Sequence, residues 1–404
     1  MSGHGRPVLL AAAGLHMVTQ SALAPFYPAL FRAAYGVEEL AATGLFLMLC
    51  QVAAVVALPL WGRATRRVPL ARLVTAGQSA AVLLAGALVL APSYAVFTVV
   101  SVLLVAAKAV VLLAYPGLAR SHRRGVLPGV VQYVAVLHAA SVVATLLGGL
   151  VVSVPDPRTA LPLLALLEAV LLVACARVLR PAPVPAAGAV RPVADPDGPL
   201  PTGGQVTRLA VYVLITAVAV YAARPYFTEY ATGAGAPAAL ATVLFVLPHT
   251  AVLAVLPAAG RLRARFGERL LPGAMLLAAV ALGVQATVTD PLALGGARLV
   301  FGAGLGLGQV ALDERVITTN GTGAAYSLIA MAQTCGLLLA PLVATATATA
   351  ALWAPLLAGA VLLAALAFLA PVSVRPTRPA PRPVGGPPLS APGTTGMTSH
   401  DIAR

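Results

Sequence analysis

A few ionisable residues of this sequence stand inside long apolar stretches. Lys108 is the only lysine in the chain, and Glu168 is the one acidic residue in the middle of an apolar stretch. The others of this kind are Arg298, His16, His138 and His249. Ionisable groups are costly in apolar surroundings, so they usually face a cavity or a partner. Because histidine titrates near pH ~6.5 and a buried carboxyl group can also exchange protons, this set could bind and release protons.

Further polar residues lie in the same stretches. Arg224 and Glu229 flank the short run "PYFT". The uncharged polar residues are Gln20, Gln132, Tyr133 and Gln333. All of them could contact a bound solute, and Lys108 and Arg298 would favour an anionic group on it. Each also has a structural alternative, which is ion pairing or hydrogen-bonded packing. For Glu168, replacement by glutamine tests the proton-carrier interpretation, because it should abolish any pH dependence of transport.

The composition shows what kind of element must position these residues. Of the 404 residues, 60% are hydrophobic and only 9% are charged, and the mean hydropathy is +0.93. Soluble domains are about 45–50% apolar and about 25% charged. A bilayer can accommodate this much apolar surface, and a spanning helix needs about 20 mostly apolar residues. The composition therefore predicts a polytopic α-helical membrane protein.

Hydropathy divides the chain into twelve expected spans. They cover residues 8–30, 40–61, 70–91, 94–115, 128–152, 159–179, 209–229, 238–258, 270–288, 291–312, 324–346 and 351–371. Short connections rich in glycine, proline and polar residues separate most of them. Glycine and proline inside several spans are compatible with membrane helices, because neighbouring helices satisfy the freed backbone groups. We expect an all-α fold of twelve transmembrane helices.

Connections rich in arginine alternate along the chain with connections that contain almost none. The rich connections and the tail contain Arg63, Arg66, Arg67, Arg72, Arg120, Arg123, Arg124, Arg180, Arg191, Arg208, Arg261, Arg263, Arg265, Arg269, Arg315, Arg375, Arg378, Arg382 and Arg404. The opposite connections contain Arg32 and Arg158. Basic residues accumulate on the cytoplasmic side, so both termini are expected in the cytoplasm of a cell-membrane protein. The net charge of +14 is mostly this asymmetry. We therefore expect membrane lipid and no nucleic acid as a partner.

The N-terminus has one alternative interpretation. The stretch "RPVLLAAAGLHMVTQSALA" has a basic start, an apolar run and small residues at its end, as a cleaved signal peptide does. Its removal would leave an odd number of spans and would place the arginine-rich connections outside. We therefore expect the stretch to be retained as the first span.

Two stretches of low complexity divide the chain. Residues 180–207 are rich in proline, alanine and glycine, which is typical of a flexible linker. The tail from 372 to 404 has the same character and is expected to be disordered in the cytoplasm. The expected domains are a six-helix half over 1–179 and a second six-helix half over 208–371.

The arginine-rich connections also recur. "GRLRARFGER" (260–269) follows the second expected span of the second half, and "GRATRRVPLAR" (62–72) stands at the same place in the first. The second copy resembles the loop signature G-x-x-x-D-R-x-G-R-R/K of the major facilitator superfamily. On these positions the resemblance implies gating residues, namely Gly62, Arg66, Arg67, Gly260, Arg261, Arg265, Gly267 and Arg269. The acid of the signature is replaced by Arg66 and Ala264, so the latch should be altered, and Asp313 or Glu314 could supply the missing acid. Lipid binding and topology are the simpler roles of these loops.

Weaker traces of the same family follow. "RLVFGAGLGLG" after Arg298 is similar to the family's R-x-x-x-G-x-G pattern, and its glycines from 302 to 308 are expected to be close-packing positions. "AASVVATLLGG" (139–149) is similar to the exporter signature, although only Gly148 and Gly149 match it well. The resemblance implies two halves that rock about a central site and expose it alternately to either side.

We therefore expect a secondary active transporter, coupled to protons, that exports a small drug-like or natural-product molecule. Uptake of a small metabolite is the alternative within transport, and a membrane sensor without flux is the alternative outside it. The sequence has no nucleotide-binding loop and no clustered acid/base or metal-ligating residues, so we expect no enzyme activity, no cofactor and no metal. We expect a monomer.

Overall fold

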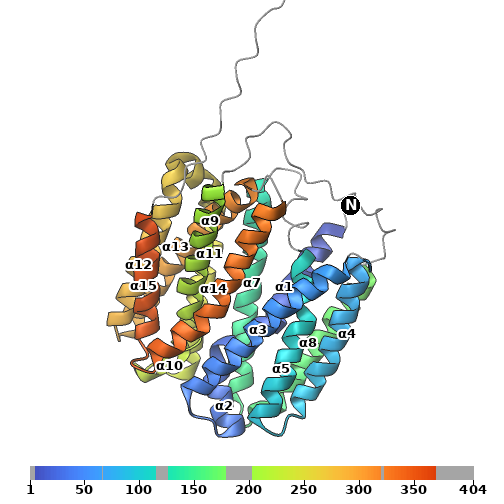
Figure 1. Ribbon diagram of the computed structural model, residues 1–404. Helices are drawn as coiled ribbons and strands as arrows, with labels where there is room; N and C mark the ends of the chain where they lie inside the picture. Colours follow the sequence, from blue (N-terminus) through green and yellow to red (C-terminus); the bar gives the residue numbers. More distant parts are fainter. Residues whose placement is uncertain (1–4, 66, 115–125, 179–202, 320–322, 370–404) are drawn as a thin grey trace, which may run out of the picture. The chain divides into compact units, whose positions relative to one another are not determined.

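The computed structural model describes residues 5–65, 67–114, 126–178, 203–319 and 323–369. Helices make up nearly all of these residues (Figure 1). The first half comprises α1 (Gly5–Ser21), η1 (Ala24–Phe26), α2 (Tyr27–Tyr35), α3 (Leu40–Ala64), α4 (Leu70–Val89), α5 (Tyr94–Lys108), η2 (Ala109–Ala114), α7 (Val126–Ser153), η3 (Pro157–Ala160) and α8 (Leu161–Val178). The second comprises α9 (Gly203–Ala222), α10 (Phe227–Gly233), α11 (Ala238–Phe266), η4 (Gly267–Arg269), α12 (Leu270–Thr287), α13 (Pro291–Thr319), α14 (Gly323–Ala348) and α15 (Ala354–Phe368).

The helices have the length and apolar character that a bilayer requires. Within the described residues, nine segments are long and apolar enough to span it, and one of them, Ala238–Thr287, contains both α11 and α12. Many large apolar side chains on these helices are exposed, among them Leu83, Leu150 and Val361. In water such surface would be strongly unfavourable, whereas lipid solvates it. The expected all-helical membrane fold is confirmed.

Proline breaks the first helix of each half at the same place. The expected span 8–30 is not continuous, because Pro25 and Pro28 cannot donate the backbone hydrogen bonds that would extend α1. The expected span 209–229 is interrupted in the same way at Pro225, between α9 and α10. Both breaks have a proline followed by two aromatic residues, "PFY" at 25–27 and "PYF" at 225–227. This internal repeat supports a shared origin of the two halves.

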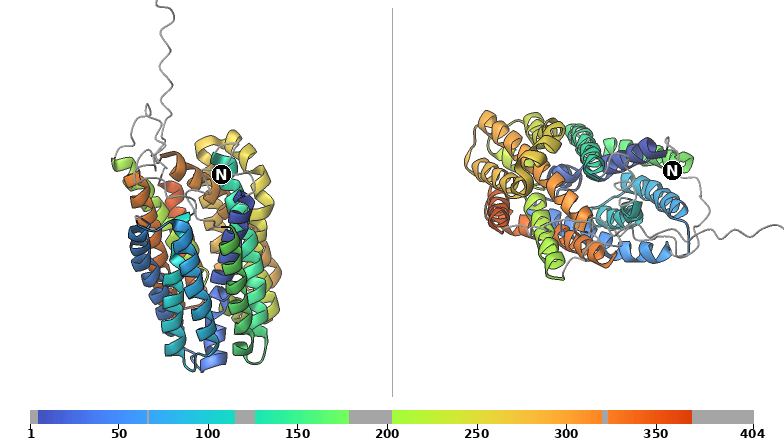
Figure 2. Two further views of the ribbon diagram at one scale, coloured as in Figure 1. Left: turned by 90° about the vertical axis from the view of Figure 1, so that its right-hand side faces the viewer. Right: turned by 90° about the horizontal axis from the view of Figure 1, so that it is seen from above.

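Contacts between the halves are reciprocal. The second long helix of the first half, α3, packs on α14, the fifth of the second half. Conversely α7, the fifth of the first half, packs on α11, the second of the other. Figure 2 shows this arrangement from the side and end-on. Such an exchange of equivalent partners is what a two-fold relationship between similar halves produces.

Close helix packing depends on small residues, as predicted for the glycines of α13. A Cβ on Gly302 would lie 2.3 Å from the Pro248 carbonyl oxygen on α11, and one on Gly304 would lie 2.8 Å from the Ala274 carbonyl oxygen on α12. Equivalent positions on Gly306 and Gly308 would meet Val252 and Met275. These glycines let α13 approach both neighbours, and Arg298 of α13 forms hydrogen bonds with both of them.

Two ends of the helix bundle are used as landmarks below. The arginine end carries the connections α3–α4 and α11–α12, and the far end carries the connections α2–α3 and α10–α11 (Figure 1). The expected linker ends earlier than residue 207, because α9 already begins at Gly203. The rest of the linker and the tail after 371 lie outside the described residues.

Candidate functional site

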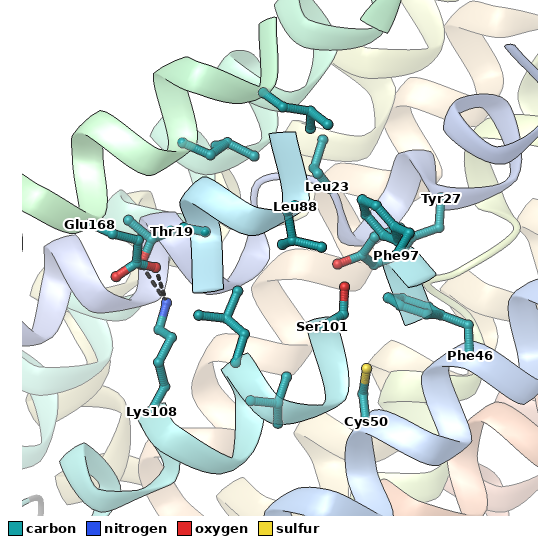
Figure 3. Close-up of a pocket in the computed structure, with 15 residues that line it drawn as sticks. Thr19, Leu23, Tyr27, Phe46, Cys50, Leu88, Phe97, Ser101, Lys108 and Glu168 are labelled. Carbon is teal, nitrogen blue, oxygen red and sulfur yellow. Dashed lines mark hydrogen bonds and ion pairs between the residues drawn. The ribbon is translucent and has the colours of Figure 1, made fainter. Parts of the chain in front are cut away.

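Lys108 and Glu168 form one buried ion pair in the first half. Lys108 closes α5, where the helix tightens into η2, and its Nζ donates to Glu168 Oε1 on α8 at 2.5 Å and to Thr19 Oγ1 on α1 at 2.7 Å. Both charged side chains are only 3% exposed. Gln78 on α4 donates from Nε2 to Glu168 Oε2 at 2.5 Å. The two charges that the sequence singled out separately are therefore each other's partners (Figure 3).

The ion pair borders a small cavity within the first half. The cavity measures about 80 Å³ and lies between α1, α2, α3, α4, α5 and α8, with Tyr27, Phe46 and Phe97 on its apolar side (Figure 3). Pockets for drug-sized ligands usually measure about 300–1,000 Å³. This cavity can hold a few waters or a very small solute. Lys108 therefore faces Glu168 and not a free anionic ligand, contrary to the expectation that it would attract one.

A second polar group crosses from one half to the other. His138 on α7 and His249 on α11 are joined through their Nδ1 atoms at 2.8 Å. His249 Nε2 lies 3.0 Å from an Arg224 nitrogen, and His138 Nε2 lies 3.1 Å from Gln309 Oε1 on α13. Both imidazoles are buried. These four residues, called the histidine chain below, bring together helices from both halves.

Arg298 lies beside the histidine chain and is 5% exposed. Its guanidinium donates to the carbonyl oxygens of Leu244 and Phe245 and to Gln285 Oε1, and it lies 3.8 Å from the centre of the Phe227 ring. Arg298 shares a pocket of about 10 Å³ with Arg224 and His249, which is too small for a solute in this state, and the residues that line this pocket include no aspartate or glutamate. The pocket is therefore basic and its charge is not neutralised by the residues that line it.

Side-chain contacts join the two halves at the far end. Arg32 on α2 donates to Glu229 on α10 at 3.0 Å, so Glu229 pairs across the halves and not with its neighbour Arg224. Thr228 Oγ1 donates to the Pro25 carbonyl at 2.6 Å, and Tyr226 donates to the Leu40 carbonyl at 3.1 Å. These contacts close the far end of the interface.

The expected gating residues lie differently from the sequence-based interpretation. Gly62 and Gly260 do not open loops, because α3 continues to Ala64 and α11 to Phe266. The turn comes at Gly267, whose φ of 53° is in the left-handed region that glycine tolerates. Of the expected gating residues, Arg67, Arg261, Arg265 and Arg269 are exposed at this end. Arg66 lies outside the described residues.

Glu314 takes part in an ion-pair cluster at the arginine end of the second half. Its Oε2 accepts from Arg263 Nε at 2.7 Å, and Arg263 also binds Glu268, which accepts from Arg315. Arg315 was expected in the connection after the span 291–312. The structure places both Arg315 and Asp313 within α13 instead. Polar residues continue this helix beyond the apolar stretch, because its backbone hydrogen bonds do not depend on side-chain polarity.

The remaining sequence candidates lie on α1, α7 and α14. His16 on α1 is buried, and its Nδ1 has no partner among the described residues. Gln132 and Gln333 are exposed on α7 and α14, and Tyr133 is half-buried. Gln20 belongs to α1, but its side chain is outside the described part of the structure.

Sequence reasoning missed the uncharged partners of these groups. Thr19, Gln78, Gln285 and Gln309 each bind one of the buried ionisable residues. The available signal was an amide inside an apolar stretch, as in "TAGQSA" around Gln78 and "GLGQVA" around Gln309. A buried amide needs hydrogen-bond partners for the same reason that a buried charge does.

Comparisons with known proteins agree with this architecture. A family model described as Major Facilitator Superfamily matches residues 9–313. The fold is similar to the crystal structure of the nucleoside transporter NupG, with a TM-score of 0.67 and 12% identity over 91% of this chain and 98% of that one. A point mutant of NupG gives a TM-score of 0.69 and 11% identity with the same coverage. No curated protein matched the sequence.

Proposed function

Because the chain belongs to the Major Facilitator Superfamily, we propose that it is a proton-coupled secondary transporter for a small organic solute that carries an anionic group. The family fold has twelve spans, and the halves 1–179 and 208–371 would rock about a site between them. The arginine distribution supports a cytoplasmic position of the arginine end and of both termini.

The basic pocket around Arg224, His249 and Arg298 carries the proposal about the solute. Two guanidinium groups and an imidazole face the same small space, and no carboxylate lines it. Arginine binds carboxylates and phosphates through short charge-assisted hydrogen bonds. Charges within a membrane protein usually have a partner, so an anionic group of the solute is the natural complement of this pocket.

The interface between the halves supports an inward-facing state. Arg32, Glu229, Thr228 and Tyr226 hold the far end together, and the solute would then reach the basic pocket from the arginine end. Opening of the far end requires that these bonds break. The proposed cycle therefore exchanges the far-end contacts for contacts at the arginine end.

Two directions of transport are supported by different observations. Export is the direction that the sequence suggested, and Gly148 and Gly149 of the exporter-like stretch do lie at tight contacts with Ala22 and Thr242. Uptake is the second candidate, and the basic pocket favours it. A solute anion and a proton would bind better together there than separately, which is cotransport. Cotransport driven by an inward proton gradient runs into the cell.

A binding screen with matched acids and amides tests the solute class. We expect benzoate, or another acid of such a panel, to raise the melting temperature of the purified protein, whereas its amide does not, because only the acid neutralises the pocket. Uridine is included as a neutral probe because NupG, whose fold is similar, is a nucleoside transporter.

Arginine variants complete this test. Arg224→Gln and Arg298→Gln should each weaken the stabilisation by acids about ten-fold or more, which corresponds to about 1.4 kcal/mol. Arg208→Gln is the control, since Arg208 is an exposed arginine on α9 with the same charge change. Stabilisation by the amides or by uridine alone would contradict an anionic solute.

A further inference from the structure

The histidine chain can form in only one arrangement of protons. The guanidinium of Arg224 has N–H donors and no acceptor, so His249 Nε2, 3.0 Å away, must accept. His249 must then carry its hydrogen on Nδ1 and donate it to His138 Nδ1 at 2.8 Å. His138 in turn carries its hydrogen on Nε2 and donates it to Gln309 Oε1 at 3.1 Å. Both imidazoles are neutral, and the tautomer of each follows from Arg224.

No imidazole nitrogen of the histidine chain can accept an extra proton without the loss of a hydrogen bond. A proton on His138 Nδ1 would face the N–H of His249, and a proton on His249 Nε2 would face the guanidinium of Arg224. In either case two donors would point at each other. The titratable groups near His249 are His138, Arg224 and Arg298, and those near His138 are His249 and Arg224, so no acid among these neighbours compensates the added charge.

The hydrogen bond that a proton on His138 Nδ1 would break joins the two halves. His138 lies on α7 of the first half, and His249 and Gln309 lie on α11 and α13 of the second. Towards the arginine end, the contact of α7 with these helices is apolar, through Val130, Val134, Val252 and Leu256. The histidine chain therefore provides polar contacts across this interface next to the apolar ones.

We propose that His138 and His249 are the proton-binding site of the transporter, and that uptake of one proton by this pair releases α7 from α11. The proton comes from the aqueous phase and binds the lone pair of His138 Nδ1, which removes the acceptor of the His249 Nδ1–H. Histidine is suited to this role because it titrates within the physiological range. This inference rests on the proposed proton coupling, but it concerns a conformational change that needs no solute.

The protonation arrangement can be tested by NMR on the full-length protein with isotope-labelled histidine. Neutral histidine usually carries its hydrogen on Nε2, whereas the chain requires Nδ1–H for His249. We expect one Nδ1–H histidine near neutral pH, and we expect its signal to be lost in His249→Gln. A spectrum in which every neutral histidine carries Nε2–H would overturn the proposal.

The proposed release of α7 from α11 should change the distance between the two halves. This distance is measured between spin labels at Thr65→Cys and Ala264→Cys. Both positions are exposed near the arginine end of different halves, and Cys50, Cys175 and Cys335 are replaced by alanine in this background. Between about pH 8 and about pH 4 we expect the ratio of two distance populations to change several-fold.

Variants of the pair decide whether these histidines are responsible. His138→Gln and His249→Gln should each abolish the change with pH, because glutamine can form hydrogen bonds but does not titrate. His16→Gln, which removes another buried histidine, should keep it. The proposal is wrong if the change persists in both variants of the pair, or if it is absent from the parent protein. Because no solute is added, this result is independent of whether the solute is an anion.

Discussion

Lys108 Nζ on α5 lies 2.5 Å from Glu168 Oε1 on α8, and neither side chain is accessible to solvent or lipid beyond 3%. Breaking such a pair leaves a buried charge without compensation, which typically costs about 3–5 kcal/mol. We therefore predict that Glu168→Gln lowers the melting temperature of the purified protein strongly, and that the double variant Lys108→Met, Glu168→Leu recovers most of the loss. Equal destabilisation by the single and double variants would contradict this interpretation.

The same double variant separates stability from proton coupling. The hypothesis that Glu168 carries the coupling proton predicts that the variant transports without pH dependence. Because Lys108 and Gln78 already hold this carboxylate, we predict instead that the pH dependence of transport persists in the double variant. If a well-folded double variant lost the pH dependence of transport, Glu168 would be the residue that carries the coupling proton.

Gly148 provides a sharp test of helix packing. A Cβ at this position would lie 1.7 Å from the Ala22 carbonyl oxygen, so Gly148→Ala should force α7 away from the end of α1. Overpacking of this kind costs about 1–3 kcal/mol. Gly86→Ala on α4 is the matched control, because nothing lies within 4 Å of the added methyl group. Thermal unfolding should show a clear loss for Gly148→Ala and none for Gly86→Ala.

The far-end ion pair should bias the cycle only modestly. Arg32 is 47% exposed in its pair with Glu229, and exposed pairs contribute about 0.2–1 kcal/mol. Glu229→Gln should therefore shift the balance towards an open far end by at most about five-fold, measured by thiol labelling of a cysteine placed beside the contact. The exchange Arg32→Glu with Glu229→Arg should restore the balance. A failure of the exchange to restore it would show that the pair does not act as a latch.

Arg224 should control the tautomer of His249. Arg224→Lys keeps a permanent donor opposite His249 Nε2, so the Nδ1–H tautomer should remain. Arg224→Gln allows either a donor or an acceptor at that place, so the tautomer should no longer be fixed. NMR of labelled histidine distinguishes the two variants. An unchanged spectrum in Arg224→Gln would show that another group orients His249.

Much of the fold could be predicted because lipid imposes a simple pattern. A helix must be long and apolar to cross the bilayer, and both properties are visible in the sequence. Helix ends were less predictable. Gly62 and Gly260 lie inside α3 and α11, since a helix continues into water as long as its backbone bonds form. The breaks at Pro25 and Pro225 were visible as prolines, but membrane helices also tolerate proline, as Pro248 in α11 shows.

The candidate site was predicted as a set of residues but not as a set of contacts. Each buried ionisable residue was found by its cost in apolar surroundings. Whether Lys108 meets Glu168 or a solute depends on the rotation of α5 and α8 about their axes, which hydropathy does not determine. His138 and His249 are 111 residues apart and lie in different halves, so their bond follows only from the packing of α7 on α11.

Proton movement during solute transport tests the central claim most directly. The protein is reconstituted into vesicles that contain a pH-sensitive dye, and an acid that stabilises it in the binding screen is added outside. We predict that the solute moves protons across the membrane with wild-type protein, and that the movement is lost in the double variant His138→Gln, His249→Gln although the acid still binds. Solute flux without any proton movement in the wild-type protein would contradict proton-coupled transport.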